Sequence, residues 1–109
     1  EYIFVAYGLS SRICLKAMDI ARSKGIKVGL FRPITLFPFP YQRLLQIASH
    51  LKMILTVELN SGQMVEDVEL AVKGKVPVSF YGKMGGIMPT PEEVVESLEK
   101  AIEELPLAN

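Results

Sequence analysis

The chain has 109 residues, half of them hydrophobic and 22% charged, a composition typical of a globular protein and not of a disordered one. Twelve Lys and Arg residues balance twelve Asp and Glu residues, so the total charge indicates neither a nucleic-acid partner nor an anionic membrane. The length predicts one domain over residues 1–109 that is large enough to bury a hydrophobic core. A chain of this length is short for a complete α/β enzyme.

Cysteine usage and the chain start indicate where such a protein belongs. The single Cys14 excludes an internal disulfide, and no Cys and His residues have the spacing of metal ligands, which suits a reducing compartment such as the cytoplasm. No apolar run reaches the roughly 20 residues that cross a bilayer. The chain begins at Glu1, directly before a predicted strand and without a signal peptide, so we expect a piece of a longer polypeptide.

The first predicted unit is a strand followed by a helix. Residues 2–7 form a short apolar run rich in aromatic and β-branched residues, which Gly8 ends, and this pattern predicts a buried strand. Ser10 or Ser11 is expected to cap the next helix, whose apolar residues recur at helical spacing until Gly25 stops it.

Two further strands, over residues 27–31 and 52–58, flank a loop and a helix over residues 41–50. The loop, residues 32–40, contains three prolines, which neither a helix nor a central strand tolerates because proline removes a donor and restricts its predecessor. Its phenylalanines are expected to be exposed in an apolar contact surface, and packing onto the domain's own core is the alternative.

Two helix starts follow in the last part of the chain. Asn60 and Gln63 have capping-box spacing for a third helix, and the run Thr-Pro-Glu-Glu from Thr90 is a strong start for a fourth. Residues 77–81 between them form the fourth predicted strand. Four apolar loop residues are candidate subunit contacts: Phe37, Phe39, Met84 and Met88.

Strict alternation of four strands and four helices predicts a three-layer α/β/α fold with a mainly parallel sheet. Right-handed crossovers favour the strand order 2-1-3-4, which changes direction between the first and third strands. Open α/β sheets bind ligands at such a switch point. The candidate ligand or interface residues at this crevice are Gly8, Ser10, Ser11, Glu58, Asn60, Gly62 and Gln63.

The roles of these residues stay open at this point. Glu58 could act as a base, hold a ligand hydroxyl, or pair with a cation of a neighbouring domain. No second titratable group accompanies it, so a structural or interface role is favoured for Glu58, Asn60 and Gln63. The turn from Gly8 to Ser11 could surround an anion, but it lacks the glycine fingerprint and the P-loop lysine. We predict no catalytic residue and no metal ligand.

Short segments spread in order over nearly the whole chain match the pattern of one known family. The most specific are Phe37-Pro-Phe-Pro40 and Glu58-Leu-Asn-Ser-Gly-Gln-Met64, accompanied by Gly25-Ile-Lys-Val-Gly-Leu-Phe-Arg-Pro33 and by Gly85-Gly86 with Pro89-Thr-Pro91. Together they resemble the C-terminal domain of the α subunit of 2-oxoacid:ferredoxin oxidoreductases, a relative of the transketolase C-terminal domain.

The resemblance implies oxidative decarboxylation of a 2-oxoacid to an acyl-CoA by the assembled enzyme, with electrons leaving to ferredoxin. Thiamine diphosphate, Mg, iron–sulfur clusters and CoA are implied for that enzyme but not for this domain, which has neither the metal–diphosphate motif nor a multi-cysteine motif. The implied role is non-catalytic packing against other α-subunit domains and the β subunit, or γ and δ subunits where present. A stand-alone flavodoxin-like small-molecule-binding module and a purely structural interface domain are the alternatives.

Overall fold

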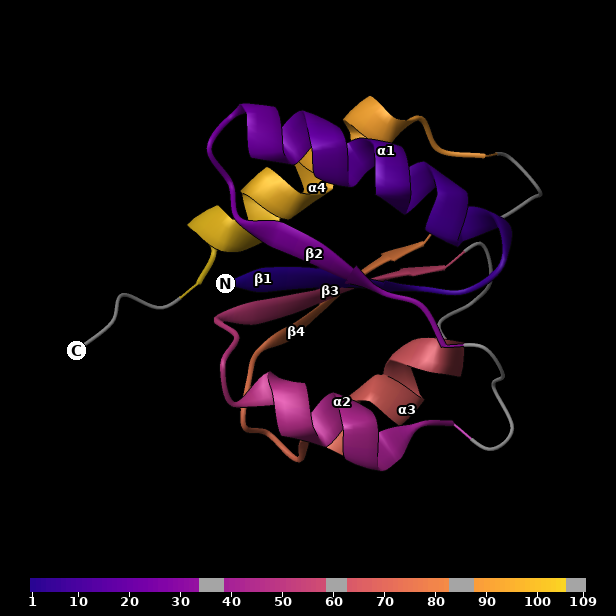
Figure 1. Cartoon of the computed structure of the whole chain (residues 1–109), viewed down its shortest axis with the longest axis vertical. Coiled ribbons are helices and arrows are strands. Elements are labelled where there is room, and N and C mark those ends of the chain that lie inside the picture. The colour runs from indigo at the N-terminus through magenta and orange to yellow at the C-terminus, as the bar shows by residue number, and fades with distance from the viewer. Residues whose placement is uncertain (34–38, 59–62, 83–87, 106–109) are drawn as a thin grey trace.

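The computed structural model describes residues 1–33, 39–58, 63–82 and 88–105. Strands and helices alternate along the chain in the predicted order (Figure 1). The elements are β1 (Tyr2–Ala6), α1 (Leu9–Ser23), β2 (Val28–Phe31), α2 (Tyr41–Ala48), β3 (Met53–Glu58), α3 (Gln63–Val72), β4 (Val78–Gly82) and α4 (Pro91–Glu103). Within the described ranges, no helix has both the length and the hydropathy needed to cross a membrane.

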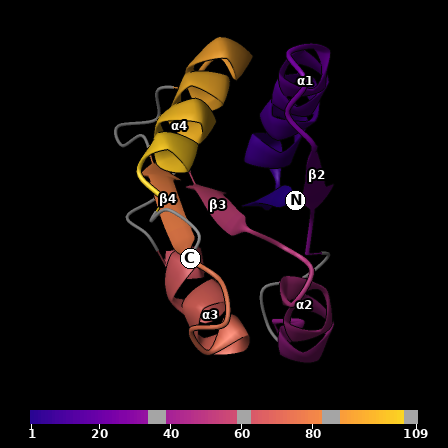
Figure 2. The same cartoon turned by 90° about the vertical axis from the view of Figure 1, so that its left-hand side faces the viewer.

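The four strands form one parallel sheet in the order β2-β1-β3-β4, which confirms the predicted strand order. Helices α1 and α4 cover one face of the sheet and α2 and α3 cover the other (Figure 2). The predicted three-layer α/β/α architecture is therefore confirmed. The edge strands are β2 and β4, and each pairs with one strand of the central pair β1 and β3.

The core lies on both faces of β3, in which all six residues are buried. Side chains alternate along the strand, so Leu55 packs with the α1 and α4 residues while Ile54 packs with the α2 and α3 residues. A strand covered on both faces needs a nearly continuous hydrophobic sequence, and Met53-Ile-Leu-Thr-Val-Glu58 provides one.

The two predicted helix caps that can be examined have opposite outcomes. The capping box of α4 is confirmed: Thr90 Oγ1 accepts from Glu93 N at 3.1 Å, and a Glu93 carboxylate oxygen accepts from Thr90 N at 2.8 Å. The prediction that Ser10 or Ser11 caps α1 is wrong, because the helix begins earlier, at Leu9, with Gly8 as the cap residue. Gly8 has φ 65°, a conformation open to glycine, which lets the chain turn tightly into the helix.

The expectation that Phe39 is exposed is also wrong. Its side chain is only 4% exposed and packs into the core between the sheet and helices α2 and α3, beside Leu44 and Met64. The Tyr41 ring lies against it with a centroid distance of 5.2 Å. Burial of a phenyl ring contributes about 1.5–3 kcal/mol, which favours this position over an exposed one. The alternative, anchoring on the domain's own core, is confirmed for Phe39, and Phe37 lies outside the described residues.

Candidate functional site

The carboxyl ends of β1 and β3 lie side by side at the predicted switch point. Ala6 pairs with Val57, so the turn that follows β1 and the Glu58 carboxylate that ends β3 lie at the same end of the sheet, where the strands terminate (Figure 1). The structure therefore places Gly8, Ser10 and Ser11 at the same carboxyl-terminal end of the sheet as Glu58, as the strand order predicts. Asn60, Gly62 and the side chain of Gln63 lie outside the described residues.

Glu58 is a buried carboxylate whose two oxygens both bind the start of α3. One oxygen accepts a hydrogen bond from Met64 N at 2.8 Å and the other from Val65 N at 3.0 Å, and the residue is 6% exposed. The first N–H groups of a helix lack intrahelical acceptors, and the helix dipole favours negative charge there. Glu58 therefore joins the end of β3 to the beginning of α3.

This arrangement supports a structural role for Glu58. Among the described Asp and Glu residues it alone is buried, and its hydrogen bonds go to the domain's own backbone. An external anion at these two N–H groups would have to displace the carboxylate. The sequence pattern assigns the α3 start to Asn60 and gives no signal for the Glu58 contact, which forms across a loop.

The two serines of the first turn are also engaged within the domain. Ser10 Oγ donates to Tyr7 O at 2.7 Å and Ser11 Oγ donates to Gly8 O at 2.6 Å, and each residue is 3% exposed. Their hydroxyl protons thus stabilise the turn rather than point to solvent. The turn that sequence analysis considered as an anion site is built by its own side-chain hydrogen bonds.

A hollow of about 530 Å³ opens beside this turn, on the β2 side of the sheet and not between β1 and β3. It contains two exposed arginines that sequence analysis did not single out, Arg12 of α1 and Arg32 after β2. Neither forms an ion pair within the described part of the chain. The complete lining is Tyr7, Gly8, Leu9, Ser11, Arg12, Arg32 and Pro33.

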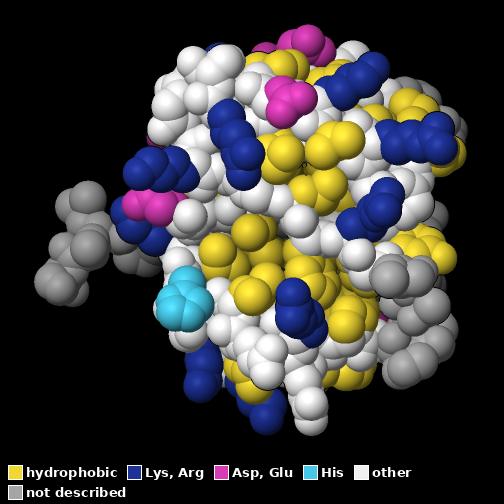
Figure 3. Space-filling model, viewed as in Figure 1, with side chains coloured by type: hydrophobic (Ala, Val, Ile, Leu, Met, Phe, Trp, Pro, Cys, Tyr) yellow, Lys and Arg dark blue, Asp and Glu magenta, His cyan; other side chains and the backbone are white. Residues whose placement is uncertain are grey.

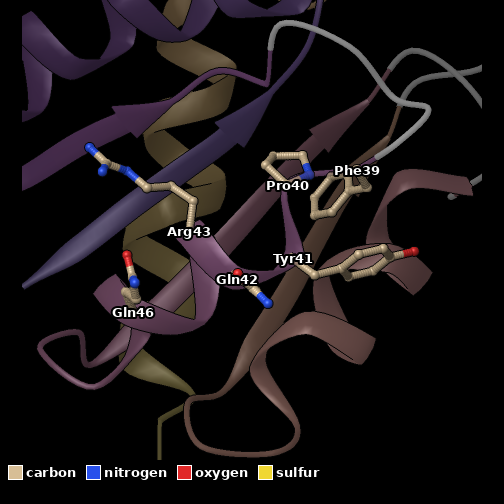
Figure 4. Close-up of a pocket in the computed structure, with 6 residues that line it drawn as sticks. All are labelled: Phe39, Pro40, Tyr41, Gln42, Arg43 and Gln46. Atoms are coloured by element: carbon tan, nitrogen blue, oxygen red, sulfur yellow. The ribbon is translucent and has the colours of Figure 1, made fainter.

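A second hollow, of about 490 Å³, lies at the start of α2 and is lined by Phe39, Pro40, Tyr41, Gln42, Arg43 and Gln46 (Figure 4). Tyr41 Oη donates to Asp67 at 2.6 Å and so connects α2 to α3, and this hydrogen bond raises the pKa of the Tyr41 phenol. Arg43 points away from Tyr41, toward the β2 side of the helix (Figure 4). Among the described residues that line this hollow, no acid–base pair is directed into it.

The remaining candidates lie apart from these hollows. Met88 is 44% exposed, as a contact residue should be, and Met84 lies outside the described residues. Cys14 is buried in α1, and burial raises the pKa of its thiol to about 12. Within the described ranges, no three His, Cys, Asp or Glu side chains gather in a way that could hold a metal ion.

The sequence of residues 1–94 matches the family described as pyruvate:ferredoxin oxidoreductase core domain II. The chain belongs to this family. This core domain II is 50% identical over 86 residues to the ketoisovalerate oxidoreductase subunit VorB of Methanothermobacter marburgensis, covering 79% of this chain and 24% of the relative. It is 37% identical over 102 residues to the 2-oxoglutarate synthase subunit KorA of Methanocaldococcus jannaschii, covering 94% of this chain and 26% of the relative. The chain thus spans about a quarter of the length of these relatives.

Solved structures confirm the fold of this core domain II. A split-gene transketolase, described as an inactive beta4 tetramer, superposes with a TM-score of 0.82 at 19% identity, covering 97% of this chain and 40% of that chain. A 2-oxoglutarate:ferredoxin oxidoreductase from Magnetococcus marinus superposes with a TM-score of 0.76 at 20% identity, covering 94% of this chain and 18% of that chain. The predicted likeness to the transketolase C-terminal domain and to the ferredoxin-linked oxidoreductases is confirmed.

Proposed function

We propose that this core domain II is the C-terminal, non-catalytic domain of the α subunit of a 2-oxoacid:ferredoxin oxidoreductase. The observation that carries the proposal is the family match over residues 1–94, supported by relatives that are named as oxidoreductase or synthase subunits. The assembled enzyme would oxidatively decarboxylate a 2-oxoacid to an acyl-CoA and pass the electrons to ferredoxin. Relatives named for ketoisovalerate and for 2-oxoglutarate leave the choice of oxoacid open.

The cofactors of that reaction are assigned by the proposal to other parts of the enzyme. The described residues of this chain do not fit an iron–sulfur cluster or a Mg²⁺–diphosphate site, because the lone cysteine is buried and no acidic side chains converge. Thiamine diphosphate, Mg, iron–sulfur clusters and CoA would therefore be held by other domains and subunits. A cytoplasmic location is part of the same proposal.

The role of the domain itself would be packing and subunit assembly. Its buried carboxylate and its buried serines are engaged in internal hydrogen bonds, which leaves them as structural groups. Exposed apolar side chains, Tyr7 and Leu9 in the first turn and Met88 before α4, are suited to contact neighbouring protein. The proposed partners are the other α-subunit domains and the β subunit, with γ and δ subunits where the enzyme has them.

The proposal is tested by preparing the full-length α subunit with and without residues 1–109 and co-expressing each form with the partner subunits. We expect the shortened subunit to fail to assemble, measured by native mass spectrometry, and to lose 2-oxoacid-dependent reduction of a viologen dye. A shortened enzyme that assembles and turns over at the normal rate would refute an assembly role.

A second candidate function, a stand-alone flavodoxin-like module, is favoured only by the hollow beside the first turn. A flavin phosphate would need hydrogen-bond donors in that turn, whereas the Ser10 and Ser11 hydroxyl protons are donated to backbone carbonyls. Flavin absorbance in the purified protein is the measurement that would support this alternative.

A further inference from the structure

The equal numbers of basic and acidic residues conceal a separation of charge in space. Residues 1–52 contain eight of the twelve Lys and Arg residues but only two of the twelve Asp and Glu residues, a formal charge of +6 (eight against two). Residues 53–109 contain the other four Lys and Arg residues and the other ten Asp and Glu residues, a formal charge of −6 (four against ten). Every residue is counted in one of these halves, so the two values cancel in the chain total.

The sheet order converts this separation along the chain into two opposite sides of the domain. The first half forms β1, β2 and the helices α1 and α2, and the second half forms β3, β4 and the helices α3 and α4. Figure 2 shows α1, β2 and α2 on one side and α3, β4 and α4 on the other. The domain therefore has a basic side at the β2 edge and an acidic side at the β4 edge.

The outer surface of α1, β2 and α2, here called the β2 face, has an apolar centre among basic side chains (Figure 3). Leu30 and Phe31 of the edge strand and Ile47 of α2 are only partly buried. An apolar centre with a polar, charged rim is the usual composition of a protein–protein interface. The exposed basic residues of these elements and their ends are Arg12, Lys16, Arg22, Lys24, Lys27, Arg32 and Arg43, and Asp19 of α1 is an exposed acidic residue among them.

Hollows with basic side chains lie at both ends of β2. The hollow of about 530 Å³ at its carboxyl end contains Arg12 and Arg32. Another of about 560 Å³ at its amino end contains Arg22 and Lys27, and also Glu1, whose carboxylate pairs with Lys52. Protruding acidic side chains of a partner would find a cation in each of them.

The β2 face is unsuited to binding by strand addition. Lys27 O accepts a hydrogen bond from Tyr2 N of β1 at 3.1 Å, and successive carbonyls along a strand alternate in direction, so the Val28 carbonyl faces away from the sheet. Arg22 Nε donates to this carbonyl at 2.9 Å. A charged side chain on an open strand edge blocks pairing with another strand, so binding here would use side chains.

Most exposed cations of the β2 face form no ion pair within the described residues. Within the described residues the ion pairs join Lys24 to Glu99 at 3.6 Å and Lys52 to Glu1 at 2.8 Å, so Lys24 is the one exposed basic residue of this face with an ion pair there. Complementary charge on a partner would therefore steer association and fix orientation.

We propose that the β2 face docks an acidic protein surface, with Asp and Glu around an apolar centre, elsewhere in the same oxidoreductase. This inference rests on the proposed function. About three quarters of each curated relative lies outside the matched region, so abundant protein is present to supply that surface. The acidic side of a second copy is a less suitable occupant, because a basic-to-acidic contact between identical copies is heterologous and forms rings or open chains.

The first test is zero-length carbodiimide cross-linking of the full-length, assembled enzyme, which joins lysine amines to carboxylates in direct contact. We expect Lys16 and Lys27 to be linked to Asp or Glu residues outside residues 1–109. Links from these lysines to α3 or α4 glutamates of a second copy, or no links beyond this domain, would overturn the proposal.

The second test uses charge reversal with a matched control. Lys16→Glu with Lys27→Glu changes the β2 face, and Lys75→Glu with Lys100→Glu makes the same change at exposed lysines of the second half. We expect the first pair to weaken assembly of the full enzyme about tenfold or more at low salt, and the control pair to leave it near wild type. Equal assembly of both variants would contradict the proposal.

The same experiments separate this inference from the proposed function. If the enzyme assembles without residues 1–109, the assembly role itself is refuted. If deletion abolishes assembly while Lys16→Glu with Lys27→Glu assembles normally and no cross-links leave the β2 face, only the inference about this face fails.

Discussion

Replacing Glu58 by Gln tests the contact between β3 and α3 with minimal change in side-chain shape. The carboxylate accepts from Met64 N at 2.8 Å and from Val65 N at 3.0 Å. Glutamine keeps one acceptor oxygen, and its amide NH₂ group then faces the second backbone N–H, donor against donor. The negative charge that favours the start of the helix is also removed.

The expected magnitude follows from these losses. A hydrogen bond to a charged group contributes about 1.5–3 kcal/mol, and a buried donor left without an acceptor costs about 1–3 kcal/mol. One neutral bond survives in the glutamine variant, so we expect α3 to be destabilised by about 2–4 kcal/mol. At about 1.4 kcal/mol for each factor of ten, its opening becomes about 30- to 1,000-fold more frequent.

Amide hydrogen exchange of the full-length subunit measures this opening directly in peptides that cover Gln63–Val72. Glu69→Gln is the matched control, because Glu69 is an exposed carboxylate on the same helix and undergoes the same chemical change. Exchange in Glu58→Gln within about threefold of the control would refute the reasoning that Glu58 holds the start of α3.

Three further predictions concern other parts of the domain. Thr90→Ala removes the side-chain acceptor of the α4 capping box and should lower the free energy of unfolding by about 0.5–2 kcal/mol in urea titrations. Thr90→Ser keeps a hydroxyl acceptor, so most of this stability should remain. Gly8→Ala should cost about 1–3 kcal/mol in thermal unfolding, because φ is 65° although a Cβ would meet no atom within 4 Å; an unchanged Tm would contradict this. Because burial raises the pKa of Cys14 to about 12 from 9.0, the stability associated with its protonated thiol is fully present below pH 9.0 and is lost as pH rises toward 12. Urea titrations between pH 9.0 and 12 should show a falling free energy of unfolding. The part of this fall that comes from the Cys14 thiol should be absent in Cys14→Ala.

Local signals in the sequence were sufficient for the elements and their order. The apolar run of β3 needs no tertiary information to be recognised as a buried strand, and the Thr90 capping box acts within four residues. The strand order followed from the alternation of strands and helices and from the handedness of crossovers, constraints that hold for α/β sheets in general.

The contacts that decide the site depend on tertiary structure. Glu58 binds α3 across a loop, and Phe39 packs into a core formed by residues from four other elements, so neither contact has a local pattern. The early start of α1 depends on the positive φ of Gly8, which allows a turn that needs no serine cap. Separation of charge between the two sides becomes visible only when the strand order places the two halves of the chain in space.

The central claim is that this core domain II stabilises the assembled oxidoreductase without taking part in its chemistry. The most direct test is kcat of the Glu58→Gln enzyme, measured per assembled complex, since Glu58 is the buried carboxylate at the switch-point edge. We predict an unchanged kcat per complex together with a smaller assembled fraction. A fully assembled variant whose kcat falls by about a hundredfold would contradict the account, because a loss of that size is typical of a missing general acid or base.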